Sequence, residues 1–426
     1  MLKENIVDKI LYQVKKLIPK RIFDFFAPAY HGLLSYIGAI VYGFPSSSMK
    51  VIGITGTKGK STTVYLVSKI LEAAGYKVAA IGSLGFKISD REWPNTLKMT
   101  MPGRTKLQKF LFEAKKAGCR FVVMEVTSEG IKQKRHWGIS FDCAVFTNLH
   151  PEHLESHGSF ENYARAKQEL FKKTKNIHVI NADDVHAPMF GDLPARKKIF
   201  YGIKKGDLRV TNVQASADKA RFDVYGQTFN LHIGGEFNIM NALAAIATAA
   251  IYNVDMPTVK PVLENIKVIP GRMEFVQYEP FRIVVDYAHT PNSLQIVYEI
   301  LKKDSSGQLI CVLGAAGGGR DRWKRLEFGK IAQQYCDHIF LTNEDPYDEN
   351  PRIIIDEVAA GIAPNAQMKV QVVLNRKEAI EKALASSNSG DTVVITGKGS
   401  ETSIAISGGR KLPWSDKKTV EELLGR

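Results

Sequence analysis

In the segment Val51–Leu71, VIGITGTKGKSTTVYLVSKIL, an apolar β-branched run passes through a glycine-rich turn directly into a helical run. A strand that leads into a helix through such a turn begins a βαβ unit, so the chain is restricted to α/β folds built on a parallel sheet. Phosphate-binding loops usually carry a glycine five positions before the glycine of Gly-Lys-Ser, and this sequence has Ile54 at that distance from Gly59. The segment therefore predicts a variant phosphate-binding loop.

Short apolar runs alternate with helical segments along the rest of the chain, a pattern typical of buried parallel strands. The runs are VIGIT, KVAAIG, FVVMEV, CAVFTN and IHVINA before residue 270, and FRIVVDYA, LICVLGA, HIFLTN, VQVVLN and DTVVITG after it. They predict an α/β protein with a central phosphate-loop domain at residues 49–270, whose sheet is mainly parallel. A Rossmann-like α/β domain is predicted at residues 271–426, and a short helical segment at residues 1–48.

The net charge of +14 over 426 residues favours anionic partners, although a basic, solvated surface gives the same number. The four cysteines are far apart and form no Cys-x-x-Cys pair, so a zinc ribbon is not expected. Cys143 and Cys311 lie in apolar runs and are predicted to be buried thiols. This cysteine usage is consistent with a reducing, cytoplasmic setting.

Residues 1–48 contain no apolar run of the ~20 residues that a membrane span needs. The longest candidate is GLLSYIGAIVYGF, Gly32–Phe44, and a basic segment precedes it. Two interpretations stay open. The segment forms short helices that pack on the following domain, or it forms an interfacial helix that makes peripheral contact with an anionic membrane.

Around the predicted loop, Gly56 and Gly59 would let backbone N–H groups approach phosphate oxygens, and Lys60 would add positive charge. Ser61 would be a magnesium ligand. The alternative is a simple glycine turn with no ligand.

Three further side chains follow predicted parallel strands, where open α/β sheets bind ligands. Glu125 ends the run FVVMEV, His153 follows CAVFTN together with Glu152, and Lys167 lies on the next helical segment. Their common position beside the loop predicts a metal and phosphate site, whereas each residue alone would more often be structural.

These motifs resemble the Mur ligase family, the ATP-dependent amide ligases that build the peptide of bacterial cell-wall precursors. The resemblance runs from about Val51 to the C-terminus. It is carried by TGTKGKSTT, MEVTSEG, TNLHPEHLESHGSFENYARAK, NADD, GEFNIMNALAA, PGRMEF, VDYAHTPNSL, GAAGGGRDRWKR and GKGSE. VDYAHTP and GKGxE are most similar to the members that add the third residue of the peptide. The resemblance implies that a substrate carboxylate attacks the γ-phosphate of ATP, and that an amine then attacks the acyl phosphate in peptidoglycan synthesis.

The resemblance also implies ATP and Mg²⁺ as cofactors and assigns roles residue by residue. The catalytic residues would be Lys60, Glu125, His153 and Lys167, and the magnesium ligands Ser61, Glu125, His153 and Lys167. Lys167 would act as a carbamate formed with CO₂, because a desolvated lysine has a lowered pKa and reacts as a nucleophile. An unmodified, phosphate-binding Lys167 is the alternative. The ATP-binding residues would be Gly56, Thr57, Lys58, Gly59, Lys60, Ser61, Thr62, Asn238, Arg272, Asp286, His289 and Lys324.

For the muramyl-peptide acceptor, the matching positions are Thr100, Thr127, Gln133 and Arg135. Glu129 departs from the family, which usually has histidine there. For the incoming amino acid, the resemblance implies Arg320, Glu344, Asp345, Gly397 and Glu401. An arginine fork at Arg320 suits a carboxylate.

Diaminopimelate-adding relatives carry Asp-Asn-Pro-Arg where this chain has Glu344–Tyr347, EDPY, so the arginine that would pair with a distal carboxylate is replaced by Tyr347. The acidic residues predict a dibasic amino acid such as lysine or ornithine. Arg352 is an alternative partner for a second carboxylate, and EDPY as a plain turn is another alternative. The expected partners are these small-molecule substrates, with no nucleic acid, and the expected state is a monomer.

The resemblance does not cover the N-terminus. Only 48 residues precede the first predicted strand, too few for the domain that holds the UDP part of the acceptor in related ligases. Two further alternatives stay open: a related ligase that acts on a non-UDP acceptor, a folate or a poly-γ-glutamyl chain, and a basic nucleotide-dependent switch that binds nucleic acid or membrane.

Overall fold

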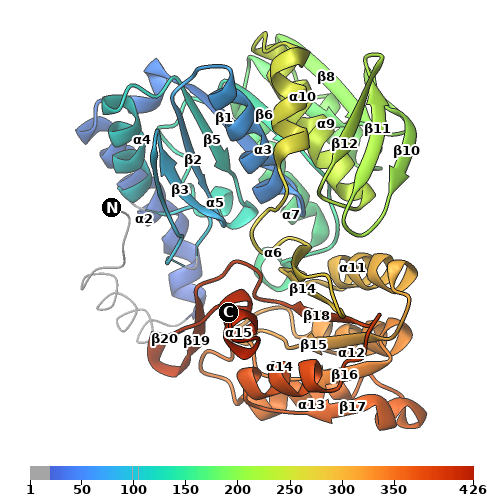
Figure 1. The fold of residues 1–426 in the computed structure, drawn as a ribbon. Helices are drawn as coiled ribbons and strands as arrows, with labels where there is room; N and C mark the ends of the chain where they lie inside the picture. The colour runs from blue at the N-terminus through green and yellow to red at the C-terminus, as the bar shows by residue number, and fades with distance from the viewer. Residues whose placement is uncertain (1–19, 98, 104) are drawn as a thin grey trace.

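The structure is a computed structural model that describes residues 20–426 except Lys98 and Arg104; the first part of the predicted N-terminal helical segment, residues 1–19, lies outside the described residues. Two sheets with helices on both faces, one above the other in Figure 1, make up most of the protein. The chain passes from the first to the second between residues 265 and 274. Below, residues 20–265 are called the first unit and residues 274–426 the second unit.

The first unit contains a nine-stranded sheet in the order β4-β3-β2-β5-β1-β6-β7-β8-β9. All neighbours from β2 to β9 are parallel, and β3 and β4 form an antiparallel edge. The strands are β1 (Lys50–Thr55), β2 (Val78–Gly82), β3 (Gly85–Ile88), β4 (Arg91–Trp93), β5 (Phe121–Glu125), β6 (Cys143–Phe146), β7 (Ile177–Asn181), β8 (Lys197–Gly202) and β9 (Leu208–Arg209).

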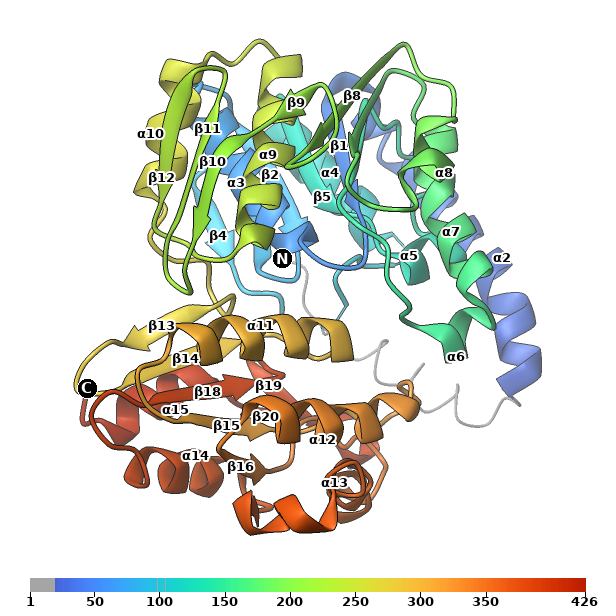
Figure 2. The same cartoon turned by 90° about the vertical axis from the view of Figure 1, so that its right-hand side faces the viewer.

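Side chains alternate between the two faces of this sheet, as Val51 and Ile52 of β1 illustrate. The face that Ile52 joins is covered by α3 (Lys60–Ala73), α9 (Glu236–Ile251) and α10 (Met256–Asn265), and by the antiparallel sheet β10 (Thr211–Ala215), β11 (Ala220–Val224) and β12 (Gln227–Leu231). The other face carries α4 (Lys106–Lys116), α5 (Ser128–Lys132), α7 (Phe160–Lys173) and α8 (Ala187–Gly191). The short α6 (Leu154–His157) precedes α7, and α2 (Lys20–Val41) and η1 (Pro45–Ser48) lead into β1 (Figure 2).

The second unit is a six-stranded sheet in the order β13-β14-β18-β15-β16-β17, parallel except for β13. Its strands are β13 (Glu274–Gln277), β14 (Arg282–Asp286), β15 (Leu309–Leu313), β16 (His338–Leu341), β17 (Val370–Val372) and β18 (Thr392–Thr396). One face packs on α11 (Pro291–Asp304), α12 (Trp323–Tyr335) and α13 (Pro351–Ala359), and the other on α14 (Arg376–Ala385) and α15 (Asp416–Leu423). The remaining elements are η2 (Pro364–Lys369), η3 (Ser407–Gly409) and the hairpin β19 (Ser403–Ile406) and β20 (Arg410–Pro413).

All ten apolar runs singled out in the sequence form strands, which confirms the predicted α/β fold. One cysteine prediction is wrong. Cys143 is a buried free thiol of β6, but Cys311 is joined in a disulfide to Cys336, which follows α12. Cys336 lies just before β16, and the parallel pairing of β16 with β15 brings the two Cα atoms to 6.0 Å, a separation that the linear sequence does not reveal.

Among the described residues, no helix is long and apolar enough to span a membrane.

A buried ion pair fixes the C-terminal helix on the second sheet. Asp416 accepts hydrogen bonds from Arg376 Nε and Nη2, both at 2.8 Å, and from Trp414 Nε1. Both charged side chains are almost fully buried. We expect Asp416→Ala to lower the free energy of unfolding by roughly 3 kcal/mol, because Arg376 would keep its charge without a partner. Urea denaturation measures this loss.

The matched control is Asp356→Ala, which removes the exposed partner of Arg352 at 2.9 Å and should cost under about 1 kcal/mol. Equal losses in the two variants would contradict the assignment of Asp416 as a buried anchor.

Candidate functional site

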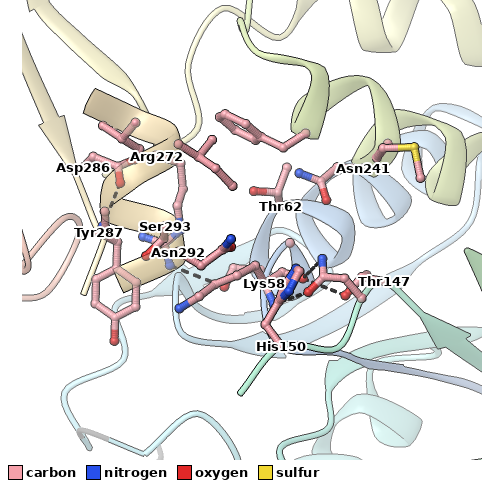
Figure 3. Close-up of a pocket in the computed structure, with 18 of the residues that line it drawn as sticks. Lys58, Thr62, Thr147, His150, Asn241, Arg272, Asp286, Tyr287, Asn292 and Ser293 are labelled. Carbon is pink, nitrogen blue, oxygen red and sulfur yellow. Dashed lines mark hydrogen bonds between the residues drawn. The ribbon is translucent and has the colours of Figure 1, made fainter. Parts of the chain in front are cut away.

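The carboxyl ends of the strands in the first unit face the second unit, and two adjoining cavities lie at this junction. The larger has a volume of about 240 Å³ and is lined by the loop after β1, by α9 and by the segment after β14. Figure 3 shows Lys58 and Thr62 on one side of it, opposite Arg272, Asp286 and Tyr287. Both units therefore contribute to one pocket.

The loop after β1 comes so close to neighbouring segments that two of its positions require glycine. A Cβ on Gly56 would overlap the hydroxyl of Thr147, and one on Gly59 would overlap the side-chain oxygen of Asn241. Both residues also have positive φ, at 151° and 80°. Gly59 is followed at once by α3, so the helix N-terminus points into the pocket and favours an anion.

Two lysines donate to the same backbone oxygen of this loop. Lys60 Nζ lies 2.9 Å from the carbonyl oxygen of Gly56, and Lys167 Nζ lies 2.7 Å from it. Burial lowers the pKa of Lys60, and burial together with the Lys60 charge holds the pKa of Lys167 well below its usual range. Lys167 therefore spends more time as a neutral, nucleophilic amine than a solvated lysine does.

Side-chain oxygens of Ser61, Ser83 and Glu125 lie close together at the edge of the loop. Ser83 donates to Glu125 Oε1 through its backbone N–H at 2.7 Å and its hydroxyl at 2.9 Å, and the hydroxyls of Ser83 and Ser61 are 2.6 Å apart. Glu125 is buried. A hydroxyl and a carboxylate beside a phosphate loop fit Mg²⁺, which takes few protein ligands and completes its shell with water and substrate phosphates. Within residues 20–97, 99–103 and 105–426, no three His, Cys, Asp or Glu side chains cluster closely enough to hold a metal alone.

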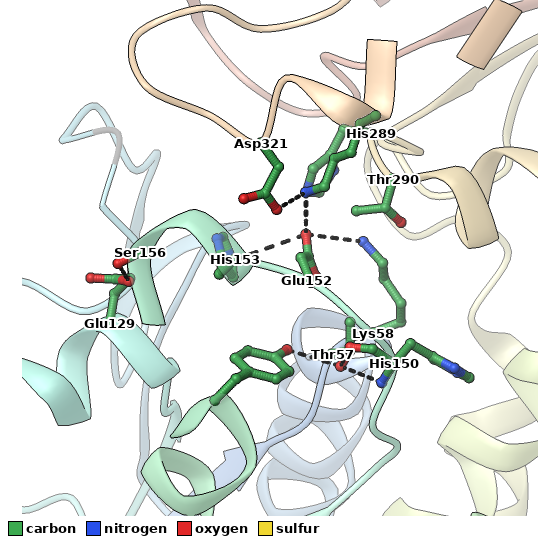
Figure 4. A network of polar contacts seen from close by, with 12 residues as sticks. Thr57, Lys58, Glu129, His150, Glu152, His153, Ser156, His289, Thr290 and Asp321 are labelled. Carbon is green, nitrogen blue, oxygen red and sulfur yellow. Dashed lines mark hydrogen bonds and ion pairs between the residues drawn. The ribbon is translucent and has the colours of Figure 1, made fainter. Parts of the chain in front are cut away.

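Glu152 lies between four basic nitrogens drawn from both units (Figure 4). Its Oε1 is 3.7 Å from Lys58 Nζ, 3.9 Å from His153 Nε2, 3.7 Å from His289 Nε2 and 3.8 Å from Lys324 Nζ. Burial would raise the pKa of this carboxyl, but the surrounding cations outweigh it and hold the pKa well below the usual range. Glu152 is therefore an ionised contact between the two units.

The two histidines beside Glu152 are neutral at physiological pH. Burial lowers the pKa of His153 to about 4 and that of His289 well below its ordinary value. His289 Nδ1 lies 2.7 Å from the carbonyl oxygen of Tyr287 and so carries the proton, which leaves Nε2 as an acceptor that faces Glu152.

The second cavity collects every residue predicted for the amino acid: Arg320, Glu344, Asp345, Gly397 and Glu401 all line it, together with Glu152, His153, His289 and Lys324. Lys398 Nζ binds two of its carboxylates, Asp345 at 2.8 Å and Glu401 at 2.5 Å. Glu344 is different. No described residue hydrogen-bonds to it or forms a close ion pair with it, and burial next to Asp345 raises its pKa to about 7.

The predicted nucleotide residues are found in four places. Lys58, Gly59, Ser61, Thr62, Arg272, Asp286 and His289 line the larger cavity. Gly56, Thr57 and Lys60 belong to the loop after β1 and make hydrogen bonds there, but they do not line the cavity. Lys324 lines the second cavity instead. Asn238 is buried, donates to the carbonyl of Gly234 and accepts from Asn241, the residue that lines the cavity. Asn241 lies one helical turn beyond Asn238, a spacing that would have pointed to it.

The predicted acceptor residues lie near one another on α5 and the loop before α4. Thr127 caps α5 by accepting from the N–H of Gly130. Arg135 donates to Gln133 Oε1, at 2.6 Å from Nη2, and to the carbonyl of Met101, one residue beyond the half-buried Thr100. The unusual Glu129 accepts from the hydroxyl of Ser156 and lies 3.3 Å from His157 Nε2, so it ties α5 to α6.

Comparisons with known proteins agree on one family. Residues 54–249 match the Mur ligase middle domain and residues 271–399 the Mur ligase, glutamate ligase domain. A UDP-N-acetylmuramyl-tripeptide synthetase of Roseiflexus sp. is 37% identical, with 90% of this chain and 80% of that protein aligned. A UDP-N-acetylmuramoyl-L-alanyl-D-glutamate--2,6-diaminopimelate ligase of Thermosynechococcus vestitus is 36% identical over 91% of this chain and 79% of that protein.

Solved structures share the fold. A UDP-N-acetylmuramoyl-L-alanyl-D-glutamate--2,6-diaminopimelate ligase is similar with a TM-score of 0.63 and 29% identity, covering 92% of this chain and 83% of that one. E. coli FolC with ADP is similar with a TM-score of 0.68 at 19% identity, over 86% of this chain and 90% of that chain, and shows the fold alone.

Proposed function

This chain belongs to the Mur ligase family of ATP-dependent, amide-forming ligases, and we propose that it adds a dibasic amino acid to a muramyl-dipeptide precursor of peptidoglycan. The observation that carries this proposal is the junction of the two cavities. The glycine-rich loop lies beside a small pocket that contains Arg320 and the buried Glu344, to which no described residue hydrogen-bonds or forms a close ion pair. The acceptor that fits is the one in the relatives' names, UDP-N-acetylmuramoyl-L-alanyl-D-glutamate.

In the first half-reaction, an acceptor carboxylate oxygen attacks the γ-phosphorus of ATP, and ADP leaves with the electrons of the broken P–O bond. Positive charge must surround the phosphates as this happens. Lys58 and Arg272 line the nucleotide cavity, and Lys60 needs only to release two loop carbonyls to reach a phosphate. Mg²⁺ held by Ser61 and Glu125 would add further charge neutralisation when bound.

We propose that Lys167 works as a carbamate. Its amine is buried and donates to the carbonyl of Gly56 in the glycine-rich loop, and its pKa lies well below the usual value. Loss of one proton from the ammonium, addition of the amine nitrogen to CO₂ and loss of a second proton from that nitrogen would give a carbamate anion at the end of a long side chain, beside two further cations, Lys58 and Lys60. This would convert a residue that repels Mg²⁺ into one that attracts it.

In the second half-reaction, the amine attacks the acyl carbon and phosphate leaves. Arg320 would bind the amino acid's α-carboxylate, and Glu344 its side-chain ammonium. The α-amine would then lie near Glu152 and the neutral Nε2 of His289, two acceptor atoms 3.7 Å apart. The attacking ammonium must lose a proton, and this pair gives the proton a place to go.

Recognition of a second carboxylate, as diaminopimelate requires, lacks an obvious cation. Tyr347 stands where the diaminopimelate-adding members carry arginine, and Arg320 donates a hydrogen bond to its side chain. Arg352, the other candidate, is exposed and paired with Asp356, and it does not line the pocket. These positions support lysine or ornithine over diaminopimelate, although several relatives are named for diaminopimelate.

The test is phosphate release from ATP with UDP-N-acetylmuramoyl-L-alanyl-D-glutamate and, in turn, lysine, ornithine and diaminopimelate, with the product masses recorded. We expect release and a matching mass gain with a dibasic amino acid. Turnover only with diaminopimelate would overturn the side-chain assignment and leave the ligase assignment standing. No turnover with this acceptor, but turnover with a folate or a poly-γ-glutamyl acceptor, would overturn the assignment of the acceptor.

We further propose that the enzyme acts in the cytoplasm as a monomer. Sedimentation of the full chain would test the monomeric state.

A further inference from the structure

In helix α2 the residues that are buried and those that are exposed are the reverse of what an ordinary surface helix shows. Soluble helices bury large apolar side chains and expose polar ones. In α2 the buried positions are small: Ala27, Gly32, Ser35, Gly38 and Ala39. These small residues allow a close approach to the first unit, where Gly38 meets Thr105 before α4 and Ala39 meets Gly138.

The solvent-exposed side of α2 carries large apolar side chains instead. They are Tyr30, Leu33, Tyr36, Ile37, Ile40 and Val41, and together they are called the outer face below. Leu33 is 57% exposed, Ile40 56% and Val41 70%. Figures 1 and 2 show α2 at the edge of the molecule. A contiguous apolar surface of this kind marks an interaction site.

The charge distribution along the sequence identifies the kind of partner. From residue 25 to residue 49 the chain has no Asp, Glu, Lys or Arg, whereas residues 1–24 contain six basic and three acidic residues. Lys134 flanks the same helix near Gly32, with its ammonium over the ring of Trp137. An apolar face with tyrosines and a basic flank is the composition of a helix that lies in a lipid interface.

We propose that the outer face of α2 docks on the surface of an anionic lipid bilayer, with its apolar side chains in the interface and the neighbouring Lys134 toward the headgroups. A second copy of this chain fits less well, because the outer face offers no charged groups that would specify pairing and two copies with a net charge of +14 repel each other. The contact is peripheral, since α2 does not meet the requirements of a membrane span. This proposal is independent of the amino acid added.

The test is flotation of the full-length protein with vesicles of phosphatidylcholine, with and without phosphatidylglycerol. We expect binding to the anionic vesicles, weakening as salt rises. The double substitution Leu33→Glu/Ile37→Glu should reduce the bound fraction by about tenfold or more, because it places two charges in the apolar face.

The matched control is Ile353→Glu/Leu374→Glu, which changes two apolar residues of the second unit that are 53% and 49% exposed. It adds the same charge and should leave most of the binding intact. Phosphate release in solution, measured without vesicles, checks that both variants fold. Equal loss of binding in both variants, or none in either, overturns the proposal.

Two other outcomes would also overturn it. If the protein does not bind vesicles but sediments as a dimer that only the α2 variant abolishes, the outer face binds a second copy of the chain. If the protein does not bind vesicles and the α2 variant melts at a lower temperature, the outer face contacts residues 1–19.

Discussion

Substitution of Lys167 by alanine should reduce kcat by about a thousandfold or more while ATP still binds. In the structure this lysine is buried, donates to the carbonyl of Gly56 in the glycine-rich loop and has a pKa well below its usual range, so on the proposed function we expect it to lie beside the transferred phosphate. The loss should be similar if the acting group is an ammonium or a carbamate, because either form would interact with the charge that develops during transfer. Steady-state phosphate release and nucleotide binding measure the two parts separately.

Rescue experiments separate the two forms of Lys167. If the side chain works as a carbamate, a small carboxylate such as formate should restore part of the activity of Lys167→Ala, and a small alkylamine should not. The wild-type protein should also incorporate label from isotopically labelled bicarbonate, detected by NMR, and Lys167→Ala should not. Rescue by the amine alone would assign the role to an unmodified ammonium.

Substitution of Glu344 by glutamine should raise KM for a dibasic amino acid by two to three orders of magnitude, and change KM for ATP little. Glu344 is buried in the second cavity, and no residue that the structure describes hydrogen-bonds to it or forms a close ion pair with it. A charged hydrogen-bonded group lost from a desolvated site costs roughly 2–5 kcal/mol. Gln keeps the shape and removes the charge. A uniform fall in kcat with unchanged KM would show that Glu344 does not bind the amino acid.

The pH dependence gives a second, independent measure of Glu344. Its pKa is raised to about 7, so the carboxyl is mostly protonated and neutral below that pH and ionised above it. An ammonium binds the ionised form, so KM for the amino acid should fall by about tenfold as pH rises from about 6 to about 8. Glu344→Gln should remove this dependence, and Asp356→Ala, far from the cavity, should leave it unchanged.

The sequence was sufficient where structure follows from local pattern. The ten strands combine apolar, β-branched residues with flanking turns, and each is found as predicted. The glycine-rich turn between β1 and α3 is also found, whereas its binding of phosphate stays a prediction. The hairpin between β11 and β12 was missed for a local reason as well. Its turn, Tyr225–Gly226, has positive φ at both residues, which usually calls for Asn-Gly, and a tyrosine conceals that signal.

Other features depend on tertiary placement and had no sequence pattern to reveal them. Glu152 was noted only as the neighbour of His153, because its three other basic partners come from three other segments of the chain. Lys398 was treated only as a spacer within GKGSE, although it binds two of the five acids that line the second cavity. The disulfide between Cys311 and Cys336 likewise depends on the pairing of β15 with β16.

Lys398, which is buried beside the second cavity, affects the charge balance of that cavity. Five carboxylates line the cavity, Glu152, Asp321, Glu344, Asp345 and Glu401. The three lining cations Arg320, Lys324 and Arg325, together with Lys398, supply four positive charges, so these groups carry one excess negative charge when all five acids are ionised. Lysine or ornithine, with two ammonium groups and one carboxylate, brings one positive charge and leaves a neutral complex. Diaminopimelate brings no net charge and would leave the imbalance in place inside a desolvated cavity, where an uncompensated charge is most costly. The choice between these amino acids would then depend on the total charge of the cavity with its substrate bound as much as on any single contact.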